Sequence, residues 1–419
     1  MLLGFNKQCI TPNLPVKLGG YELDRVAYDI HDDLYIRCIV FYSNNTYYVF
    51  AQCDLIGIDT LLLDRVYEQV SHMNIKKEHI IITATHTHSG PVGVINTDTK
   101  MFSELVSIFG ETDYNYINDI ADKITIAIQE SMHNMIETTV EIARGEIDGV
   151  GANRHNIEEP GDNSLLVYRF TREDQKQILL YNYACHPTVT GPNNTMITAD
   201  FPYAVENKLP YDMCVFVNSC AGDISSRFTR IDSSFKQAEI YSHIIVNSIE
   251  NALKHPVYTG NLTDINIKNY TLDMPIKKVK PIDESIKEYH HYQLQLEEAK
   301  KQNMKNLRVL ESYVEGAKVA VSLSKCLEGI KSLDIQYSII QLQDIIMVTI
   351  PGELFSSLGR VLKDQGIEVL GYGNGYYLYI ADYHAYDNSY YEAMSSIFEK
   401  GAGELLIQDI IEKVKSGHL

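Results

Sequence analysis

The chain has 419 residues, 45% of them hydrophobic, which is enough to bury a large core in two or three domains or in one large α/β unit. The formal net charge is −19 and the pI is about 5.1, and such an acidic surface repels phosphate backbones and anionic lipid headgroups. Nucleic acid is therefore excluded as an expected partner. Stable membrane insertion is also excluded, because no apolar run approaches the roughly 18 residues of a membrane span.

The cysteines and the N-terminal segment bear on the cellular compartment of the protein. Seven cysteines are scattered without a Cys-x-x-Cys pair, which is typical of reduced thiols, and Cys38, Cys53 and Cys214 fall in apolar runs expected in the core. The N-terminus lacks the basic region and apolar stretch of a signal peptide. We therefore expect a cytoplasmic protein.

The first third of the chain predicts strands and helices in alternation. Apolar, β-branched runs predict a strand pair over 34–41 and 46–53. Hydrophobic residues at helical spacing predict an amphipathic helix over 60–73. A short buried strand over 79–85 then leads directly into a polar loop, and a second helix is expected over 115–135.

The middle of the chain continues this pattern. Strands are expected over 138–146, 164–171 and 176–184. A further apolar strand over 215–218 runs into a loop of small and polar residues, and 235–254 predicts a helix.

The segment 282–330 is the longest amphipathic stretch, and it predicts one long helix or a helical pair. Asp283, after Pro281, is the expected N-cap, and Gly316 is expected to interrupt the pattern.

Two more strands, over 333–341 and 344–350, are followed by a helix expected over 353–366 that starts at Glu353. The alternation of strands, loops and helices predicts an α/β fold with mixed β-sheets flanked by helices. The chain has no long linker and no low-complexity tract, which favours a single large catalytic domain. Chemistry in such folds gathers where strands end.

The first polar cluster contains His86 and His88, directly after a predicted strand. Side chains at i and i+2 of an extended segment share a face, so both imidazoles would face one site. Paired imidazoles suit zinc or another borderline metal ion. The alternative is a loop with two solvated histidines, which is the commoner outcome for an isolated His-x-His.

Two single residues extend this cluster. His186 ends another apolar strand, and Pro187 holds it extended. Glu353 would lie at the positive end of a helix dipole, where a carboxylate stays ionised as a metal ligand must. Taken singly, a histidine or a glutamate in such a position more often has a structural role than a metal-binding one.

Two further segments contain candidate groups. Asn218 to Arg227 is rich in small residues whose N–H groups can approach a substrate oxygen, and Ser225 is a candidate nucleophile or donor. Eight tyrosines fall between 372 and 391, and Tyr379 and Tyr391 among them are candidate site residues. The alternative for this segment is a tyrosine-rich core or rim.

Taken in order, these segments resemble the neutral (non-lysosomal) ceramidase family. The matching motifs run from residue 9 to about 395, and the histidine loop and the Pro-Gly-Glu segment are the most specific. They are Cys9-Ile10-Thr11-Pro12, Leu18 to Tyr21, Thr85 to Pro91, Asn153-Arg154, His186-Pro187-Thr188 with Ala199-Asp200, Gly222 to Ser225, Pro351-Gly352-Glu353, Asn374 to Tyr379, and Tyr391-Glu392-Ala393.

The resemblance implies a site and an activity. It implies one Zn²⁺ per chain, held by His86, His186, Glu353 and Tyr379. It implies that the scissile bond is lined by His88, Arg154, Ser225 and Tyr391. The family hydrolyses the amide of ceramide, and its larger members carry a further C-terminal β-sandwich domain. We expect residues 1–419 to form a single ceramidase-like domain without that addition.

Three departures from the family bear on the substrate. Ser226-Arg227 stand where the family usually has Pro-Asn, and we expect the extra domain and a secretion signal to be absent. The substrate is therefore either lipid-like, as in ceramide, or a smaller soluble amide, ester or lactone.

The expected mechanism is attack of zinc-bound hydroxide on an acyl carbon. His88 would move a proton to the leaving group, Arg154 would orient the substrate, and Asp200 or Asp223 would fix a histidine tautomer. The competing mechanism makes Ser225 a covalent nucleophile with His88 as its base.

Three rival functions stay open. They are an esterase or lactonase, a metal-dependent lyase or isomerase acting on a small polar molecule, and a non-catalytic binding protein. The oligomeric state is left open between a monomer and a homo-oligomer.

Overall fold

The computed structural model describes residues 1–21, 25–159, 161–304 and 307–417. Most of its strands lie in two sheets, of nine and four strands, in which antiparallel pairs are mixed with the parallel pairs β6–β7, β11–β13 and β18–β20. The larger sheet has the order β13-β11-β10-β8-β1-β5-β6-β7, and β15 pairs with β8. Its strands are β1 (Leu2–Cys9), β5 (Tyr35–Ser43), β6 (Thr46–Cys53), β7 (Ile80–Ala84), β8 (Ile136–Glu146), β10 (Ser164–Arg172), β11 (Gln177–Tyr183), β13 (Met213–Asn218) and β15 (Tyr258–Asn261).

The smaller sheet has the order β16-β17-β18-β20. Its strands are β16 (Ile265–Pro275), β17 (Ser332–Leu342), β18 (Ile345–Thr349) and β20 (Ile367–Leu370). Shorter pairs are formed by β2 (Val16–Lys17), β3 (Val26–Ala27), β4 (Asp29–Ile30), β9 (Ala152–Asn153), β12 (Met196–Ile197), β14 (Ile224–Ser225), β19 (Glu353–Leu354) and β21 (Tyr379–Ile380).

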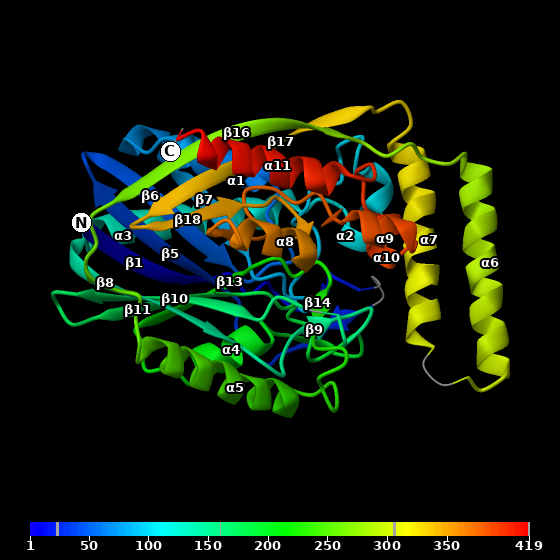
Figure 1. The fold of residues 1–419 in the computed structure, drawn as a ribbon, viewed down its shortest axis with the longest axis horizontal. Helices are drawn as coiled ribbons and strands as arrows, with labels where there is room; N and C mark the ends of the chain where they lie inside the picture. Colours follow the sequence, from blue (N-terminus) through cyan, green and yellow to red (C-terminus); the bar gives the residue numbers. More distant parts are fainter. Residues whose placement is uncertain (22–24, 160, 305–306, 418–419) are drawn as a thin grey trace.

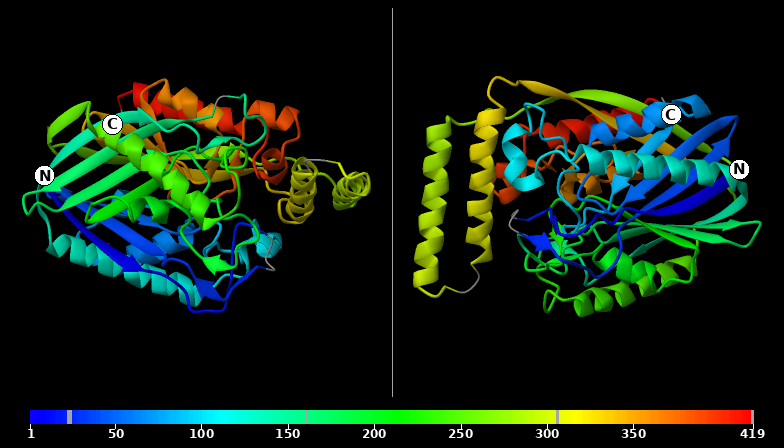
Figure 2. Two further views of the ribbon diagram at one scale, coloured as in Figure 1. Left: turned by 90° about the horizontal axis from the view of Figure 1, so that it is seen from below. Right: turned by 180° about the vertical axis from the view of Figure 1, so that it is seen from behind.

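The two large sheets pack face to face, with helices on their outer faces (Figures 1 and 2). Side chains along β5 alternate between the two faces of the larger sheet. Ile39 and Phe41 lie in the apolar core between the sheets, whereas Cys38 and Val40 lie in the core shared with the helices. The larger sheet is covered by α1 (Thr60–Val70), α3 (Tyr114–His133), α4 (Phe201–Glu206) and α5 (Phe235–Leu253), and the smaller by α8 (Ser356–Lys363) and α11 (Ala402–Lys415). The predicted α/β fold with mixed sheets flanked by helices is confirmed.

Short helices complete the fold. They are η1 (Ser71–Met73), η2 (Lys77–His79), η3 (Ser103–Leu105), α2 (Val106–Phe109), α9 (Tyr383–Asp387) and α10 (Tyr391–Ser395).

The predicted helical segment is a pair of helices, α6 (Ile282–Lys301) and α7 (Arg308–Cys326), that projects from the body with α7 on the inner side (Figure 1). Asp283 is not the N-cap as predicted, since Pro281 takes that position and Asp283 lies in the first helical turn. Gly316 does not interrupt α7. A Cβ atom there would lie 2.8 Å from the Met394 side chain, so the glycine lets α7 pack closely on α10.

The helix predicted to start at Glu353 begins later. Glu353 lies in strand β19, and α8 starts at Ser356 with Phe355 as its N-cap. The helix dipole therefore does not account for the negative charge of Glu353, and the side chains that contact Glu353 must stabilise that charge.

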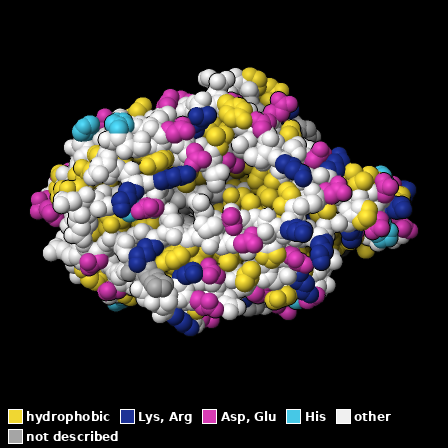
Figure 3. All heavy atoms as spheres, turned by 90° about the horizontal axis from the view of Figure 1, so that it is seen from above, with side chains coloured by type: hydrophobic (Ala, Val, Ile, Leu, Met, Phe, Trp, Pro, Cys, Tyr) yellow, Lys and Arg dark blue, Asp and Glu magenta, His cyan; other side chains and the backbone are white. Residues whose placement is uncertain are grey.

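Six of the seven free cysteines are buried, and Cys9 is exposed. The predicted core positions of Cys38, Cys53 and Cys214 are thus confirmed. Among the described helices, none has the length and apolar character needed to cross a lipid bilayer. Acidic and basic side chains are interspersed over the face in Figure 3, including the projecting helical pair.

Candidate active site

His86 follows β7 in a tight turn. Its φ is 69°, so the segment is not extended as predicted, and its backbone N–H donates to the Leu55 carbonyl at 2.9 Å. The ring Nδ1 lies 2.6 Å from the Ile56 carbonyl oxygen, which can only accept, so Nδ1 carries the proton. The Nε2 atom is left as a lone pair that faces the site.

His186 is held in the same way after β11. Its backbone N–H and its ring Nδ1 both point at the Ile224 carbonyl oxygen, at 3.1 and 3.0 Å. Because that carbonyl fixes the proton on Nδ1, the Nε2 lone pair of His186 also faces the site.

Both lone pairs face Glu353. Its Oε2 lies 3.3 Å from Nε2 of His86 and 3.1 Å from Nε2 of His186, and all three side chains are buried. Burial alone would raise the pKa of Glu353, but positive charge on the two histidines outweighs it and holds the pKa well below its usual range, and a cation between the three groups would act in the same direction. The carboxylate is therefore ionised, although it is not at a helix terminus.

Two tyrosines adjoin Glu353. Tyr376 donates its hydroxyl to Oε1 at 2.5 Å, which fixes the carboxylate from the other side. Tyr379 is the register partner of Glu353 in the parallel pair β19–β21, and both line the same cavity. Burial raises the pKa of Tyr379 well above its ordinary value, so without a metal ion it is a neutral phenol.

His88 joins the cluster from the same loop as His86. Its Nε2 lies 3.2 Å from that of His86, and the potential ligand atoms of His86, His88 and His186 lie within 4.8 Å of one another. Burial and the two neighbouring imidazoles hold the pKa of His88 well below its usual value, so the ring is neutral. Its Nδ1 is buried and has no hydrogen-bond partner in the described part of the chain.

Arg154 reaches the cluster from the segment after β9. Its Nε donates to Glu392 at 2.5 Å, its Nη1 lies 3.4 Å from Nε2 of His186, and its guanidinium lies 5.3 Å from the Tyr379 ring centre. Its Nη2 is buried and finds no hydrogen-bond acceptor among the described residues. Sequence reasoning missed Glu392, although it lies beside Tyr391 in a recognised motif.

The two aspartates expected to fix histidine tautomers do not do so. Asp223 accepts hydrogen bonds from the N–H and hydroxyl of Ser356 and from Asn153. Asp200 accepts from Val189, Thr190 and Phe201 at the start of α4. Backbone carbonyls fix both tautomers instead, and a carbonyl carries no signal in the sequence.

Ser225 lies in β14, directly after the Ile224 carbonyl that holds His186. In the ranges that the structure describes, its hydroxyl has one hydrogen bond, accepted from the Arg227 N–H at 3.4 Å. Within these ranges no hydrogen bond joins Ser225 to His88.

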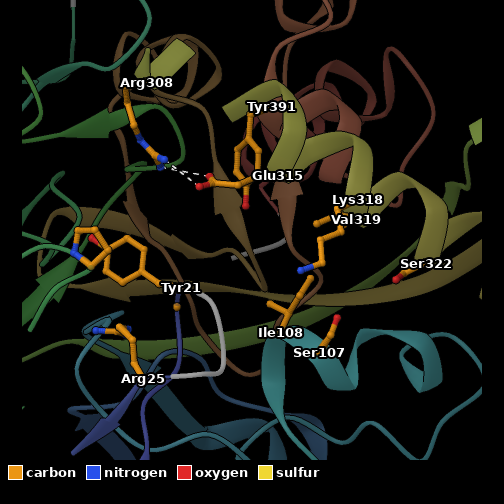
Figure 4. A pocket seen from close by; sticks show the side chains of 12 residues that line it. Tyr21, Arg25, Ser107, Ile108, Arg308, Glu315, Lys318, Val319, Ser322 and Tyr391 are labelled. Carbon is orange, nitrogen blue, oxygen red and sulfur yellow. Dashed lines mark hydrogen bonds and ion pairs between the residues drawn. The ribbon is translucent and has the colours of Figure 1, made fainter. Parts of the chain in front are cut away.

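A cavity opens beside the cluster. A small chamber of about 40 Å³ is lined by His86, His88, Glu353 and Tyr379. It shares Gly20, Ile108, Val319 and Tyr391 with an outer cavity of about 310 Å³. One wall of the outer cavity comes from α7, which contributes Arg308, Glu315, Lys318, Val319 and Ser322, and Tyr21 and Arg25 lie opposite (Figure 4). The cluster is therefore reached between α7 and the N-terminal segment.

The donor set fits a metal ion. Ligand atoms about 2.0–2.2 Å from a tetrahedral zinc ion lie about 3.3 Å apart. The separations here are 3.3 Å for His86–Glu353 and 3.1 Å for His186–Glu353. Two imidazole lone pairs and a carboxylate oxygen point at one another without a proton between them, which is electrostatically unfavourable unless a cation joins them.

The structure thus defines a class of protein, a layered α/β protein whose buried histidine cluster can hold a metal ion. Residues 1–209 match the family described as neutral/alkaline non-lysosomal ceramidase, N-terminal. The chain belongs to this family over the matched region, and the resemblance stated from the sequence is confirmed.

Solved structures agree in fold. The crystal structure of neutral ceramidase from Pseudomonas aeruginosa superposes with a TM-score of 0.75 and 15% identity, covering 98% of this chain and 73% of that chain. A ceramidase complexed with C2 gives a TM-score of 0.74 and 14% identity, covering 99% of this chain and 75% of that chain. Identities this low establish the fold alone. No curated protein sequence matches the chain.

Proposed function

We propose that this protein is a zinc-dependent hydrolase that cleaves an amide (N-acyl) bond, and that residues 1–419 form its single catalytic domain. One observation carries the proposal: the Nε2 atoms of His86 and His186 converge on one oxygen of Glu353, at 3.3 and 3.1 Å, with both Nδ1 protons held by backbone carbonyls. Membership of the ceramidase family supports amide hydrolysis.

His86, His186 and Glu353 would hold the zinc ion, and Tyr379 would complete the set from β21. A zinc ion held there supplies Lewis acidity and activates a water molecule toward an acyl carbon. Tyr376 keeps the Glu353 carboxylate in place through its hydrogen bond to Oε1. We expect one zinc ion per chain.

Arg154 and Tyr391 would bind the amide. The buried Nη2 of Arg154 is a donor without an acceptor in the described structure, so a substrate oxygen can satisfy it. Glu392 fixes the guanidinium by accepting a hydrogen bond from Nε at 2.5 Å. Tyr391 lines both chambers, where its hydroxyl can donate to the same acyl group.

His88 would carry the proton to the leaving amine. Its ring is neutral at pH 7, because burial and the adjacent imidazoles lower its pKa, and its Nδ1 has no partner in the described structure. The alternative with Ser225 as nucleophile has less support, because the described residues place no base on the Ser225 hydroxyl. A cytoplasmic location stays a prediction.

The test is hydrolysis by the zinc-loaded protein of matched amides, esters and lactones in water enriched in heavy oxygen. Amide cleavage with one solvent oxygen in the released acid supports the proposal. Preference for esters or lactones would favour an esterase or lactonase. An unsaturated product without solvent oxygen would indicate a lyase.

A further inference from the structure

The inner chamber beside the histidine cluster is enclosed by buried side chains. One wall is apolar and contains Ile56, Phe109, Tyr376 and Leu378, each at most 5% exposed. The rings of Phe109 and Tyr376 pack edge to face with their centres 5.8 Å apart, which stiffens this wall. A group bound in the chamber therefore lies between a rigid apolar wall and the histidine cluster.

The volume of the inner chamber limits what can enter it. About 40 Å³ corresponds to about three water-sized groups, at roughly 10–15 Å³ each. The attacking water takes one of these places, so that the oxygen of an acyl group and one further carbon would fill the others. A long alkyl chain on the acyl carbon exceeds this volume several-fold.

One buried hydroxyl in this chamber lacks a partner. Ser395 is 2% exposed and lines the chamber, and its Oγ makes no hydrogen bond to any described residue. Ser395 lies four residues after Tyr391 in α10, so the two side chains share a face of the helix, and both line the chamber. Because an unsatisfied buried hydroxyl is costly, a group that enters the chamber is expected to bring an acceptor oxygen.

The two chambers assign the two parts of the substrate. The outer cavity is lined by Arg308, Glu315 and Lys318 (Figure 4), and these charged side chains suit a polar group better than an alkyl chain. Gly20 lines both chambers, and a Cβ atom there would lie 2.4 Å from Nδ1 of His88, so the proposed proton donor lies at the passage between them. The amine that takes its proton from His88 therefore leaves toward the outer cavity, and the acyl group faces the inner chamber.

We propose that the inner chamber is a subsite for a short acyl group, formyl or acetyl, and that Ser395 donates a hydrogen bond to an oxygen on the acyl carbon. The enzyme would then remove a one- or two-carbon acyl group from a polar amine. This inference rests on the proposed function and names its substrate class.

The reaction balances with water alone. The C–N bond of the amide breaks, water supplies the oxygen of the new C–O bond, and the nitrogen leaves with a proton, so the products are formate or acetate and a free amine. Attack by water places two oxygens on the acyl carbon. Their lone pairs supply acceptors for Tyr391 and Ser395 together.

The first experiment varies the acyl chain on one polar amine. The zinc-loaded protein is given the N-formyl, N-acetyl, N-butanoyl and N-octanoyl derivatives of serinol, a small amino diol. We expect kcat/KM for the acetyl derivative to exceed that for the octanoyl derivative by about a hundredfold. Phe109→Leu, which enlarges the chamber, should shift the preference toward the butanoyl derivative. Phe102→Leu is the matched control, because Phe102 is equally buried but lines neither chamber.

Two variants of Ser395 separate its hydroxyl from the space around it. Ser395→Ala removes the donor and should lower kcat/KM for the formyl and acetyl derivatives by about tenfold each. Ser395→Thr keeps the hydroxyl and adds a methyl group, so it should lower kcat/KM for the acetyl derivative about tenfold relative to the formyl derivative. Unchanged kcat/KM in both variants, with unchanged melting temperatures, contradicts the role of Ser395.

Binding of acyl hydroxamates tests the subsite without turnover. These compounds carry the acyl group on a zinc-binding head, so calorimetry on the zinc-loaded parent compares acetohydroxamate with octanohydroxamate. Tighter binding of acetohydroxamate supports the inference even if no amide is hydrolysed, in which case only the proposed function fails. Equal or tighter binding of octanohydroxamate, or equal hydrolysis of the acetyl and octanoyl amides, overturns the inference and leaves the proposed function standing. Failure of both hydroxamates to bind overturns both.

Discussion

Glu353 and Tyr379 are register partners across the parallel pair β19–β21, although 25 residues separate them in the sequence. The pairing places two of the proposed metal ligands side by side on one small piece of sheet. The two strands approach closely at Gly352, where a Cβ atom would lie 2.6 Å from the Leu378 carbonyl oxygen. The geometry of the site therefore depends on this backbone contact.

Gly352→Ala should separate β19 from β21. We expect zinc affinity to fall by about 10–100-fold, the range found when the support of a ligand is lost. Zinc competition against a chelating dye measures this effect. Gly19→Ala is the control, because its new methyl group meets nothing closer than 3.7 Å. Equal zinc affinity in both variants would show that the strand pair does not position Glu353.

Glu392 gives a pH prediction. Burial alone would raise its pKa, but Arg154 and His155 outweigh burial and lower the pKa from 4.5 to about 2. A depressed carboxyl pKa stabilises the fold above the unfolded value, so about 3 kcal/mol is present above pH 4.5 and is lost as the pH falls from 4.5 toward 2.

Glu392→Gln should remove that dependence. We expect urea unfolding to show a smaller loss of stability between pH 5 and pH 3 in the variant than in the parent. At neutral pH the variant should be less stable by about 3–5 kcal/mol, since Arg154 stays buried without its partner. Parallel pH profiles for the two proteins would contradict this account of Glu392.

Thiol reactivity tests the buried cysteines. Six of the seven are buried, and burial raises the pKa of thiols such as Cys38, Cys53 and Cys214. Since the thiolate is the reactive form, a thiol reagent should label only Cys9 in the native protein and all seven cysteines after denaturation. Rapid labelling of two or more native thiols would contradict the fold in these regions.

Ser225→Ala separates the two mechanisms. The hydroxyl accepts one hydrogen bond, from Arg227, in the described structure, so its removal should leave turnover within about tenfold of the parent. Steady-state kinetics on a cleavable amide measures this. Complete loss of activity with zinc and fold intact, together with a trapped acyl-enzyme in the parent, would establish Ser225 as a covalent nucleophile.

Much of the fold follows from local patterns in the sequence. Strand β7 is apolar and β-branched, strand β11 is rich in leucine and tyrosine, and each leads into a loop, so the segments containing His86 and His186 could be placed at strand ends. The family motifs then grouped His86, His186 and Glu353, which the structure brings within hydrogen-bonding distance.

The remaining features of the fold and of the site depend on contacts between residues that are distant in the sequence. The Ile56 and Ile224 carbonyls orient the histidines, and a carbonyl is present at every residue. The sequence predicts a helix that starts at Glu353, but pairing with β21 holds this residue in a strand. The role of Tyr376 was not predicted, because several tyrosines lie near it in the sequence and only the fold selects the one that contacts Glu353.

The most direct test of the metal site is elemental analysis of the purified protein beside His86→Ala and Glu353→Gln, with circular dichroism to confirm the fold of each. The account predicts about one zinc ion per chain in the parent, and loss of zinc in both variants. Absence of bound metal in the parent, with no uptake when zinc is added, would contradict the hydrolase proposal and favour a non-catalytic binding protein.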